Sequence, residues 1–398
     1  MSVLSDDVQT RSRAMNRRIL LFMIQAVTLQ IIAVVLRVAT SYQGIELGMS
    51  TLTIGLVSSS FALFPIFFSV FVGRLLDRHG EPPALLGGSV FLVVSAALFL
   101  LFRGSALGLT AATMALGLGH FLTMVGQHSY VASHSDPARR DAQFGWYAAA
   151  ISLGQAIGPV LIALPAQGTR PDMGPVFLIG GGVATFHFLI TLPVVRGLTA
   201  PVPVVAGDRS KIGSLVRIPG LPTAILSGIA VMAALDLLAI YLPVLGTERQ
   251  IEAAVVASLL SLRALATLAA RLAYGSMIRH LSRNAFLALT IGGSAIGVAL
   301  LTIPAPLPFL VVAILITGFG LGAALPITLS IIIDIAPRAD RGTVLSLRQS
   351  ALRLSQVFIP VAGGGLALFA GVSGVFLLLA VFLGGAALVA AKSIPRPA

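Results

Sequence analysis

The chain has 398 residues, of which 57% are hydrophobic and only 10% are charged, and its mean hydropathy is +0.99. Because a soluble domain carries roughly 25% charged residues, this composition indicates an integral membrane protein. The chain contains no cysteine, which excludes disulfides and thiolate chemistry.

Apolar runs follow one another along the whole chain. Each is long and unalternating, as a helix that crosses a membrane with about 20 residues requires, whereas a barrel strand needs about ten residues of alternating polarity. The predicted spans are 19–42, 51–72, 84–102, 106–131, 142–166, 174–195, 221–246, 251–272, 285–305, 307–333, 341–370 and 371–391. We therefore expect an all-α integral membrane protein with 12 transmembrane helices, the first of them retained rather than cleaved as a signal peptide.

One connection is much longer than the others. Residues 196–220 are rich in proline and glycine, carry four basic residues, and separate six spans from six. We expect an N-terminal six-helix bundle at 1–195, a linker at 196–220 and a C-terminal six-helix bundle at 221–398.

Lysine and arginine are unevenly distributed between the two sides of the membrane. The termini and the loops on their side hold 18 of these residues, whereas the opposite loops hold only Arg103, Arg170 and Arg249. The positive-inside rule then predicts cytoplasmic termini in a bacterial-type inner membrane. The net charge of +12 reflects this bias, and since the basic residues are dispersed without interleaved aromatics, we expect no nucleic-acid partner.

Two short sequences recur about 200 residues apart. "LGQAIGP" at 153–159 returns as "LSQVFIP" at 354–360, and "GRLLDRHGE" at 73–81 returns as "GSMIRHLSR" at 275–283. Each copy lies at the same place in its half. This repeat predicts two pseudo-symmetric six-helix bundles.

The loop between the second and third spans reads G-x-x-x-D-R-x-G, with Gly73, Asp77, Arg78 and Gly80. With twelve spans split six and six around a basic linker, this motif resembles the major facilitator superfamily over essentially the whole chain. The resemblance implies two bundles around a substrate path near the bilayer midplane, no cofactor and transport by alternating access. The motif ends differently from many members, with Glu81-Pro82-Pro83.

The resemblance also implies a role for the loop. The aspartate at Asp77 is expected to face the N-terminus of the eleventh helix, whose dipole favours a carboxylate by roughly 0.3–1 kcal/mol. Gly73, Asp77, Arg78 and Gly80 would then form a cytoplasmic gate, to which we assign Asp334 at the end of the tenth span. The alternative is that the loop carries arginine for topology alone.

"GQAIGP" on the fifth span resembles the antiporter signature of the family's exporters, although the signature's closing glycine pair is missing. Gly154 and Gly158 permit close helix packing, and Pro159 is expected to kink the helix. Because small residues four apart are common in membrane helices, packing alone is the alternative.

Charges at mid-membrane depth are costly and need a reason. Arg37, Arg263, Arg353 and Asp236 lie inside predicted spans. Uncharged polar residues share their helix faces or lie on neighbouring spans. The candidate substrate-binding residues are Arg37, His120, Gln127, Gln155, Arg263, Gln349, Arg353 and Gln356.

The surplus of arginine favours a small organic anion as the substrate. Arg263 and Arg353 come from two helices of one half, and the planar guanidinium suits carboxylate or phosphate. Two alternatives stay open: Asp236 pairs with an arginine and the substrate is neutral or amphipathic, or the substrate is a cationic drug.

Coupling to protons requires a titratable group in the path. Asp236 is the mid-depth carboxylate and His120 titrates near neutral pH, so both are candidates for proton coupling. For His128 and His187 we expect ordinary hydrogen-bonded packing. Uncoupled facilitated diffusion is the alternative.

An intramembrane enzyme is the main competing class. It would need a nucleophile with its base or a metal site, yet His128 and His134 lie on nearly opposite faces of a helix and no HExxH motif is present. We therefore expect a secondary transporter, not an enzyme, without metal or cofactor. It would move an organic anion or metabolite, or as an alternative export amphipathic drugs in exchange for protons, and it would act as a monomer in the lipid bilayer.

Overall fold

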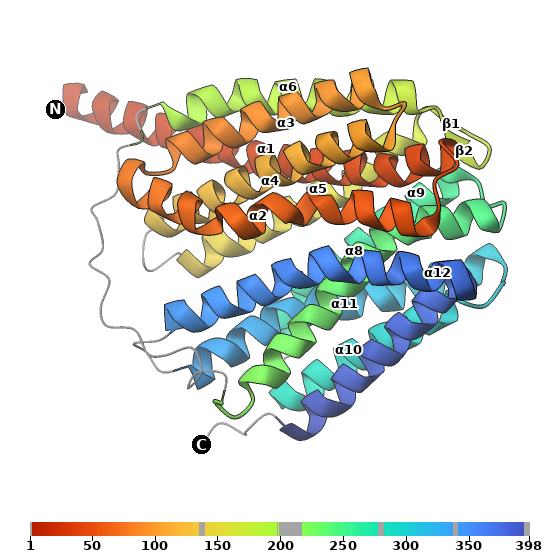
Figure 1. Cartoon of the computed structure of the whole chain (residues 1–398). Helices are drawn as coiled ribbons and strands as arrows, with labels where there is room; N and C mark the ends of the chain where they lie inside the picture. The colour runs from red at the N-terminus through yellow and green to blue at the C-terminus, as the bar shows by residue number, and fades with distance from the viewer. Residues whose placement is uncertain are drawn as a thin grey trace.

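The computed structural model of the chain describes residues 2–134, 140–196, 198, 217–277, 282–336 and 341–393. It gives the backbone alone at 2–17, 69–70, 77, 140–142, 167, 341–343, 346 and 393. The described helices are α1 (Ser2–Glu46), α2 (Thr51–His79), α3 (Pro82–Phe102), α4 (Ala106–His134), α5 (Arg140–Ala163), α6 (Met173–Val195), α8 (Leu221–Glu248), α9 (Ala253–Met277), α10 (Arg283–Leu300), α11 (Leu307–Ile335) and α12 (Arg341–Ser393) (Figure 1).

These 11 helices account for twelve membrane crossings in the described part of the chain. The last one, α12, has 53 residues and changes direction at Gly371, where φ is 65° and ψ is 175°. Its apolar stretch of 46 residues, Leu347–Lys392, is about twice the length that one crossing needs. The prediction of separate spans at 341–370 and 371–391 is confirmed. The backbone at the bend has a positive φ, which glycine adopts more readily than other residues because it has no Cβ.

Among the described elements, a short hairpin is the one that the sequence analysis did not predict. Strand β1 (Ala166–Gln167) pairs antiparallel with β2 (Arg170–Pro171), between α5 and α6. Gly168 takes a positive φ of 66° in the turn. With two residues in each strand, the hairpin is too short to show the alternation that identifies a strand.

Polar side chains cap the N-termini of several helices. Ser50 accepts a hydrogen bond from the backbone N–H of Thr53 at 3.2 Å, and Asp172 accepts one from Gly174 at 2.9 Å. Ser282 caps α10 in the same way. Each satisfies a backbone donor that the helix itself leaves unpaired.

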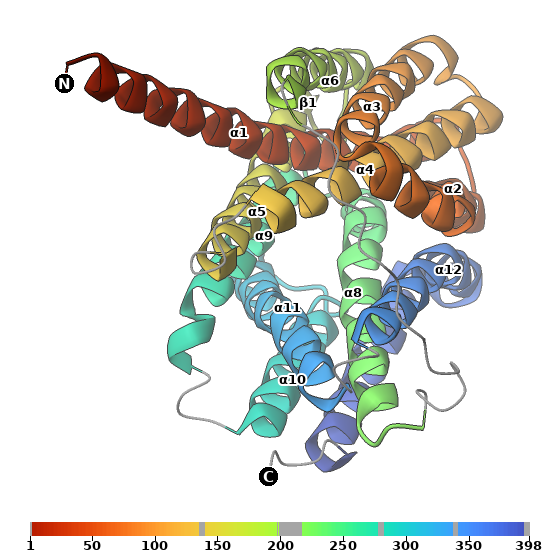
Figure 2. The ribbon, with the colours of Figure 1, turned by 90° about the vertical axis from the view of Figure 1, so that its left-hand side faces the viewer.

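The helices form two bundles, α1–α6 and α8–α12 (Figures 1 and 2). In the first bundle, Gly88 and Gly119 allow α3 and α4 to approach so closely that an added Cβ would overlap the neighbouring helix. In the second bundle, Gly297 and Gly320 do the same for α10 and α11. The predicted all-α membrane fold of two pseudo-symmetric bundles is confirmed.

The bundles meet tightly at the end that carries β1 and β2, here called the hairpin end. Tyr241 Oη of α8 donates to the carbonyl of Thr51 on α2 at 3.4 Å, and Thr51 Oγ1 donates to the carbonyl of Gly364 on α12 at 3.0 Å. The backbone N–H of Ala253 donates to the carbonyl of Gly168 at 2.8 Å. These bonds join residues of one bundle to residues of the other.

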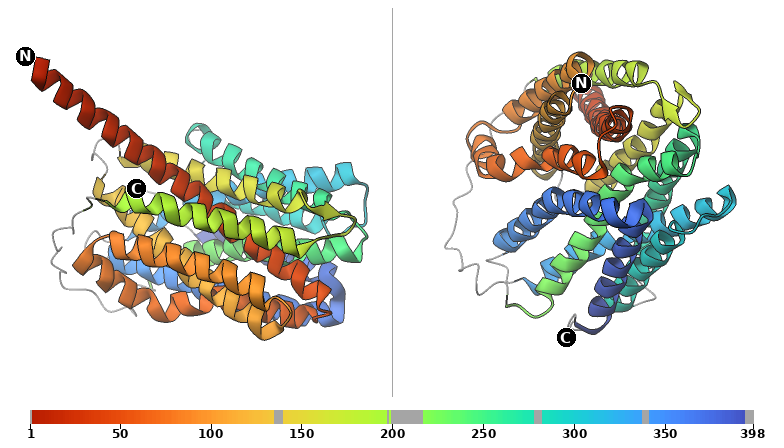
Figure 3. Two further views of the ribbon diagram at one scale, coloured as in Figure 1. Left: turned by 90° about the horizontal axis from the view of Figure 1, so that it is seen from above. Right: turned by 45° about the vertical axis from the view of Figure 1, so that its right-hand side comes forward.

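The bundles diverge toward the opposite end, here called the terminal end because both chain termini lie there (Figures 1 and 3). The first turns of α1 project beyond the other helices at this end (Figures 2 and 3). The arrangement leaves room for a cavity between the bundles.

Candidate functional site

A polar cavity of about 300 Å³ lies between the two bundles. Its walls come from α1, α2, α4, α5, α8, α9, α11 and the first part of α12. The polar and charged side chains in the lining are Gln30, Arg37, His120, His128, Gln155, Asp236, Arg263, Arg271, Gln349, Arg353 and Gln356.

The structure brings together seven of the eight predicted substrate-binding residues in this lining. The exception is Gln127, which is buried on α4 away from the cavity. Its Oε1 accepts a hydrogen bond from Tyr147 Oη at 3.1 Å, and its Nε2 donates to Gln25 Oε1 at 3.3 Å. Gln127 therefore connects α1, α4 and α5 inside the N-terminal bundle.

Asp236 pairs with Arg37 across the two bundles. Arg37 Nη2 on α1 lies 2.7 Å from Asp236 Oδ1 on α8. The Oδ2 atom of Asp236 has no hydrogen-bond partner among the described residues. One carboxylate oxygen of Asp236 is thus engaged by Arg37 and the other is left unpaired.

Arg263 on α9 and Arg353 on α12 are buried, with exposed fractions of 7% and 8%. Within the described part of the chain, the Nε and Nη1 atoms of Arg263 and the Nε atom of Arg353 have no hydrogen-bond partner. Arg353 Nη1 donates to Gln356 Oε1 at 3.0 Å. Since Asp236 is already bound to Arg37, the lining carries more positive than negative charge.

Aromatic rings support two of the arginines. The guanidinium carbon of Arg37 lies 4.6 Å from the ring centre of Phe61, and that of Arg353 lies 5.3 Å from the ring centre of Phe121. The negative face of an aromatic ring stabilises a nearby cation. The two phenylalanine rings thus partly stabilise the positive charge of the arginines. The N–H groups in the guanidinium plane stay available for hydrogen bonds.

Amides on α1 and α5 orient the cavity histidine. Gln155 Nε2 donates to Gln30 Oε1 at 3.3 Å, which turns the Nε2 of Gln30 toward His120 Nε2 at 3.4 Å. Because an amide nitrogen only donates, this contact requires a neutral His120 ring with its hydrogen on Nδ1. His120 Nδ1 has no partner among the described residues.

The polar lining residues that were not predicted as site residues are Gln30, His128 and Arg271, and the aromatic one is Phe61. His128 lines the cavity and its ring centre lies 5.4 Å from that of Tyr147. His187, for which packing was also expected, is buried, with Nδ1 2.8 Å from Thr28 Oγ1. Arg271 lines the cavity and donates to Ser152 Oγ at 2.8 Å, which joins α9 to α5. The sequence does not identify Phe61 as a site residue, because apolar residues are common throughout membrane helices.

The cavity is accessible from the terminal end. His128 on α4 and Gln349 on α12 are exposed and both lie toward that end of their helices. At the hairpin end, in contrast, Tyr241 donates to the carbonyl of Thr51 and Thr51 donates to the carbonyl of Gly364, and both bonds join the bundles. The described conformation is therefore open toward the terminal end.

The predicted gate residues make no contact between the bundles in the part of the chain that the structure describes. Arg78 is exposed, and a Cβ added to Gly73 would meet nothing. Gly80 ends α2 with a φ of 72°, which favours glycine. Asp334 forms an ion pair with Arg283 of its own bundle. The side chain of Asp77 lies outside the described atoms.

The fifth-helix signature lies at the contact between α1 and α5. A Cβ on Gly154 would overlap the backbone oxygen of Val27, and one on Gly158 would lie 2.9 Å from Val34 Cβ. Pro159 faces the cavity, and α5 continues through it. Both glycines thus have a packing role within one bundle.

In the described chain, no three His, Asp or Glu side chains are grouped closely enough to hold a metal ion.

Known proteins resemble this chain at the level of sequence and of structure. The family model described as Major Facilitator Superfamily matches residues 15–249 and 224–398. A stretch of 115 residues is 31% identical to the tetracycline resistance protein, class B, of Escherichia coli. That stretch covers 27% of this chain and 26% of the relative, so the match spans about a quarter of the relative's length.

Solved structures of transporters share the fold. The crystal structure of the nucleoside transporter NupG superposes with a TM-score of 0.77 at 12% identity, covering 94% of this chain and 98% of that one. A POT family transporter in complex with a thioalcohol-conjugated peptide gives a TM-score of 0.74 at 14% identity, covering 94% and 95%. At these identities the likeness concerns the fold.

Proposed function

Because this chain belongs to the Major Facilitator Superfamily, we propose that it is a secondary transporter that carries a small organic anion across the membrane by alternating access. The observation that supports the anion is the pair Arg263 and Arg353, buried in the cavity with unpaired guanidinium nitrogens. A buried cation without a partner is strongly unfavourable, and a bound carboxylate or phosphate would supply one.

The moving units in this proposal are the bundles at 1–195 and 221–398, joined by the linker at 196–220. They rock about the cavity, so that the bonds of Tyr241 and Thr51 at the hairpin end break while the terminal end closes. The gate at Gly73, Asp77, Arg78 and Gly80 belongs to that closed state. The basic residues near the terminal end support cytoplasmic termini in an inner membrane.

We assign proton coupling to Asp236. A substrate anion that attracts Arg37 leaves the Asp236 carboxylate without its ion-pair partner, and an unpaired buried carboxylate takes up a proton to lose its charge. His120 is the poorer carrier, since Arg37, Arg263 and Arg353 already make the cavity positive. Its Nδ1–H is instead free to donate to the substrate. The protein acts as a monomer that binds substrate and protons and no nucleic acid.

Export of amphipathic compounds is the second candidate. It is favoured by the stretch that is 31% identical to the tetracycline resistance protein and by the partial antiporter signature at Gly154, Gly158 and Pro159. In that case the Arg37–Asp236 pair has a structural role and the substrate carries no net negative charge.

Transport by the purified protein in liposomes separates the two candidates. Labelled mono- and dicarboxylates and a cationic dye would be offered with and without a pH gradient, to wild type and to Arg263→Gln and Arg353→Gln. Loss of a charge-assisted hydrogen bond costs about 1.5–3 kcal/mol, so we expect the half-saturating anion concentration to rise roughly 10- to 100-fold.

Arg103→Gln, outside the cavity lining, serves as the control and should behave as wild type. If the dye moves and the anions do not, and if both cavity variants move it as well as wild type, the protein is an exporter with structural arginines.

A further inference from the structure

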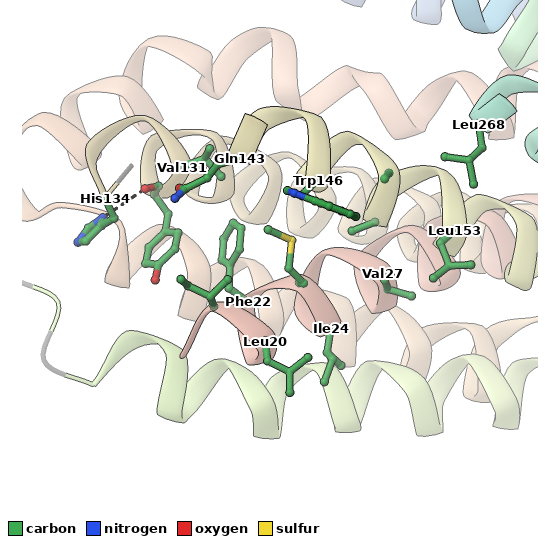
Figure 4. A pocket seen from close by; sticks show the side chains of 15 residues that line it. Leu20, Phe22, Ile24, Val27, Val131, His134, Gln143, Trp146, Leu153 and Leu268 are labelled. Atoms are coloured by element: carbon green, nitrogen blue, oxygen red, sulfur yellow. Dashed lines mark hydrogen bonds between the residues drawn. The ribbon is translucent and has the colours of Figure 1, made fainter. Parts of the chain in front are cut away.

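A second and larger cavity, of about 1010 Å³, lies on the side of the N-terminal bundle between α1 and α5 (Figure 4). We call it the lateral groove. Nearly all of its lining is apolar or aromatic. The lining residues are Ile19, Leu20, Phe22, Met23, Ile24, Val27, Tyr130, Val131, His134, Gln143, Trp146, Ala149, Ala150, Leu153 and Leu268.

The lateral groove is separate from the transport cavity. Helix α5 presents Trp146 and Leu153 to the groove and Gln155 to the cavity. Between the groove and the cavity, Arg271 of α9 donates a hydrogen bond to Ser152 of α5 and holds these two helices together. The groove therefore needs an occupant other than the substrate in the cavity.

The groove faces the surroundings of the membrane helices. The exposed fraction is 71% for Trp146, 60% for Leu20 and 44% for Leu153, although all three are large and apolar. On a membrane-spanning bundle such side chains contact lipid acyl chains. The groove extends along α1 from Leu20 to Val27 (Figure 4).

The two ends of the groove differ in polarity. His134 and Gln143 lie at one end, and Leu153 and Leu268 lie at the other (Figure 4). The polar end is nearer the terminal end of the bundle, because α4 ends at His134 and α5 begins a few residues before Gln143. This matches a molecule with a polar head at the membrane surface and an apolar tail at depth.

Positive charge gathers at the polar end. Arg18 directly precedes the lining residues Ile19 and Leu20, and its Nη2 donates to the carbonyl of Arg196 at 3.1 Å. The sequence places further arginines just before it, at 11, 13 and 17. Glu81, a carboxylate near Tyr130 of the lining, accepts from Ser129 and Ser133 and is buried at 1% exposure. Basic clusters at the end of a membrane helix attract anionic lipid headgroups.

We propose that the lateral groove binds an anionic phospholipid, with an acyl chain between Trp146 and Leu153 on one side and α1 on the other, and with its phosphate against Arg18. The site is independent of the transported substrate. The bound anionic lipid would contact both α1 and α5.

Trp146 allows a direct test, because it is the only tryptophan in the chain and it lines the groove. The full-length protein would be placed in phosphatidylcholine vesicles that contain increasing amounts of phosphatidylglycerol with brominated acyl chains, which quench tryptophan fluorescence on contact. Brominated phosphatidylcholine in the same matrix reports contact with bulk lipid.

We expect phosphatidylglycerol to quench Trp146 saturably and at lower mole fractions than phosphatidylcholine. Arg18→Gln should raise the half-quenching mole fraction of phosphatidylglycerol about fivefold, the factor associated with one basic residue at an anionic surface. Arg18→Lys, which keeps the charge, and Lys392→Gln, a basic residue at the end of α12, should leave it unchanged. Equal quenching by the two lipids, or a preference that Arg18→Gln does not reduce, would overturn the proposal.

Discussion

The three arginines in the cavity differ in the partners that their guanidinium groups contact. Arg37 has a carboxylate partner and an aromatic ring, whereas Arg353 has an amide and a ring, and two nitrogens of Arg263 have no partner in the described chain. Leaving buried donors unpaired costs stability, so a protein retains them where a ligand completes them. In the proposed mechanism, Arg263 and Arg353 hold the substrate, and Arg37 leaves Asp236 when the substrate attracts it.

Asp236→Asn tests the coupling role. Asparagine keeps the shape of the side chain and accepts a hydrogen bond from Arg37, but it cannot take up a proton. We expect accumulation driven by a pH gradient to be lost, while exchange of anion across the membrane at equal pH continues. Both are measured as flux of the labelled anion into proteoliposomes.

The control is Glu46→Gln, which removes an exposed carboxylate outside the cavity lining. Accumulation should therefore persist in this variant. Gradient-driven accumulation that survives in Asp236→Asn would remove Asp236 from the coupling step.

Gln127→Leu separates packing from binding. It breaks the hydrogen bonds with Tyr147 and Gln25 and leaves both partners buried, which we expect to destabilise the protein by about 1–3 kcal/mol. The affinity for the anion should not change, because Gln127 lies outside the cavity lining. Thermal unfolding in detergent and anion flux measure the two effects, and a weakened affinity without loss of stability would place Gln127 in the site.

Single residues can be predicted to have a special role where their burial is energetically costly. A charge in a membrane helix needs a partner or a ligand, so Arg37, Asp236, Arg263 and Arg353 are identifiable from the sequence. The sequence does not show which of these charges pair, because Arg37 and Asp236 are 199 residues apart and on different bundles. Uncharged polar residues are harder: a glutamine such as Gln127 serves helix packing as readily as a substrate.

At the scale of helices, α2 and α12 approach each other through glycines. A Cβ on Gly55 would overlap the Pro360 carbonyl oxygen and lie 2.7 Å from Tyr241 Oη, and a Cβ on Gly364 would lie 2.7 Å from the same hydroxyl. The contact lets Tyr241 and Thr51 bond across the bundles. Small residues on both helices thus allow the hairpin end to close.

Gly55→Leu should keep the hairpin end from closing. The chain has no cysteine, so Ser41→Cys on α1 gives a single labelling site without background. Ser41 is fully buried in this conformation. We expect a membrane-impermeant maleimide, added from the side of the hairpin end, to label Ser41→Cys slowly and to label it faster when Gly55→Leu is present.

The control is Gly182→Leu on α6, because Gly182 is exposed and an added Cβ there meets nothing. Labelling of Ser41→Cys should stay slow in that background. Equal labelling rates with and without Gly55→Leu would show that the glycine contact does not hold this end closed.

Helices are the best predicted elements, since about 20 apolar residues in a row have no other stable form in a membrane. The bend at Gly371 falls at the predicted boundary between two spans. The hairpin β1–β2 was missed because the turn at Gly168 and two paired residues on each side leave no periodic pattern.

At the scale of the whole molecule, the repeats at 153–159 and 354–360 predict the pseudo-symmetry, and the motif at Gly73–Gly80 points to the family. Neither predicts which end is open. One sequence must support both conformations of a transporter, so the choice depends on the balance between the contacts at each end. The bonds of Tyr241 and Thr51 favour the conformation described here.

The central claim is that an organic anion bound by Arg263 and Arg353 shifts the protein between these conformations. The most direct test measures, by double electron–electron resonance, the distance between spin labels at Ala132→Cys on α4 and Ser276→Cys on α9, both exposed near the terminal end. We expect the transported carboxylate to add a population with a shorter distance, and Arg353→Gln to abolish the change. A distance distribution that the anion leaves unaltered, or alters equally in Arg353→Gln, would contradict the account.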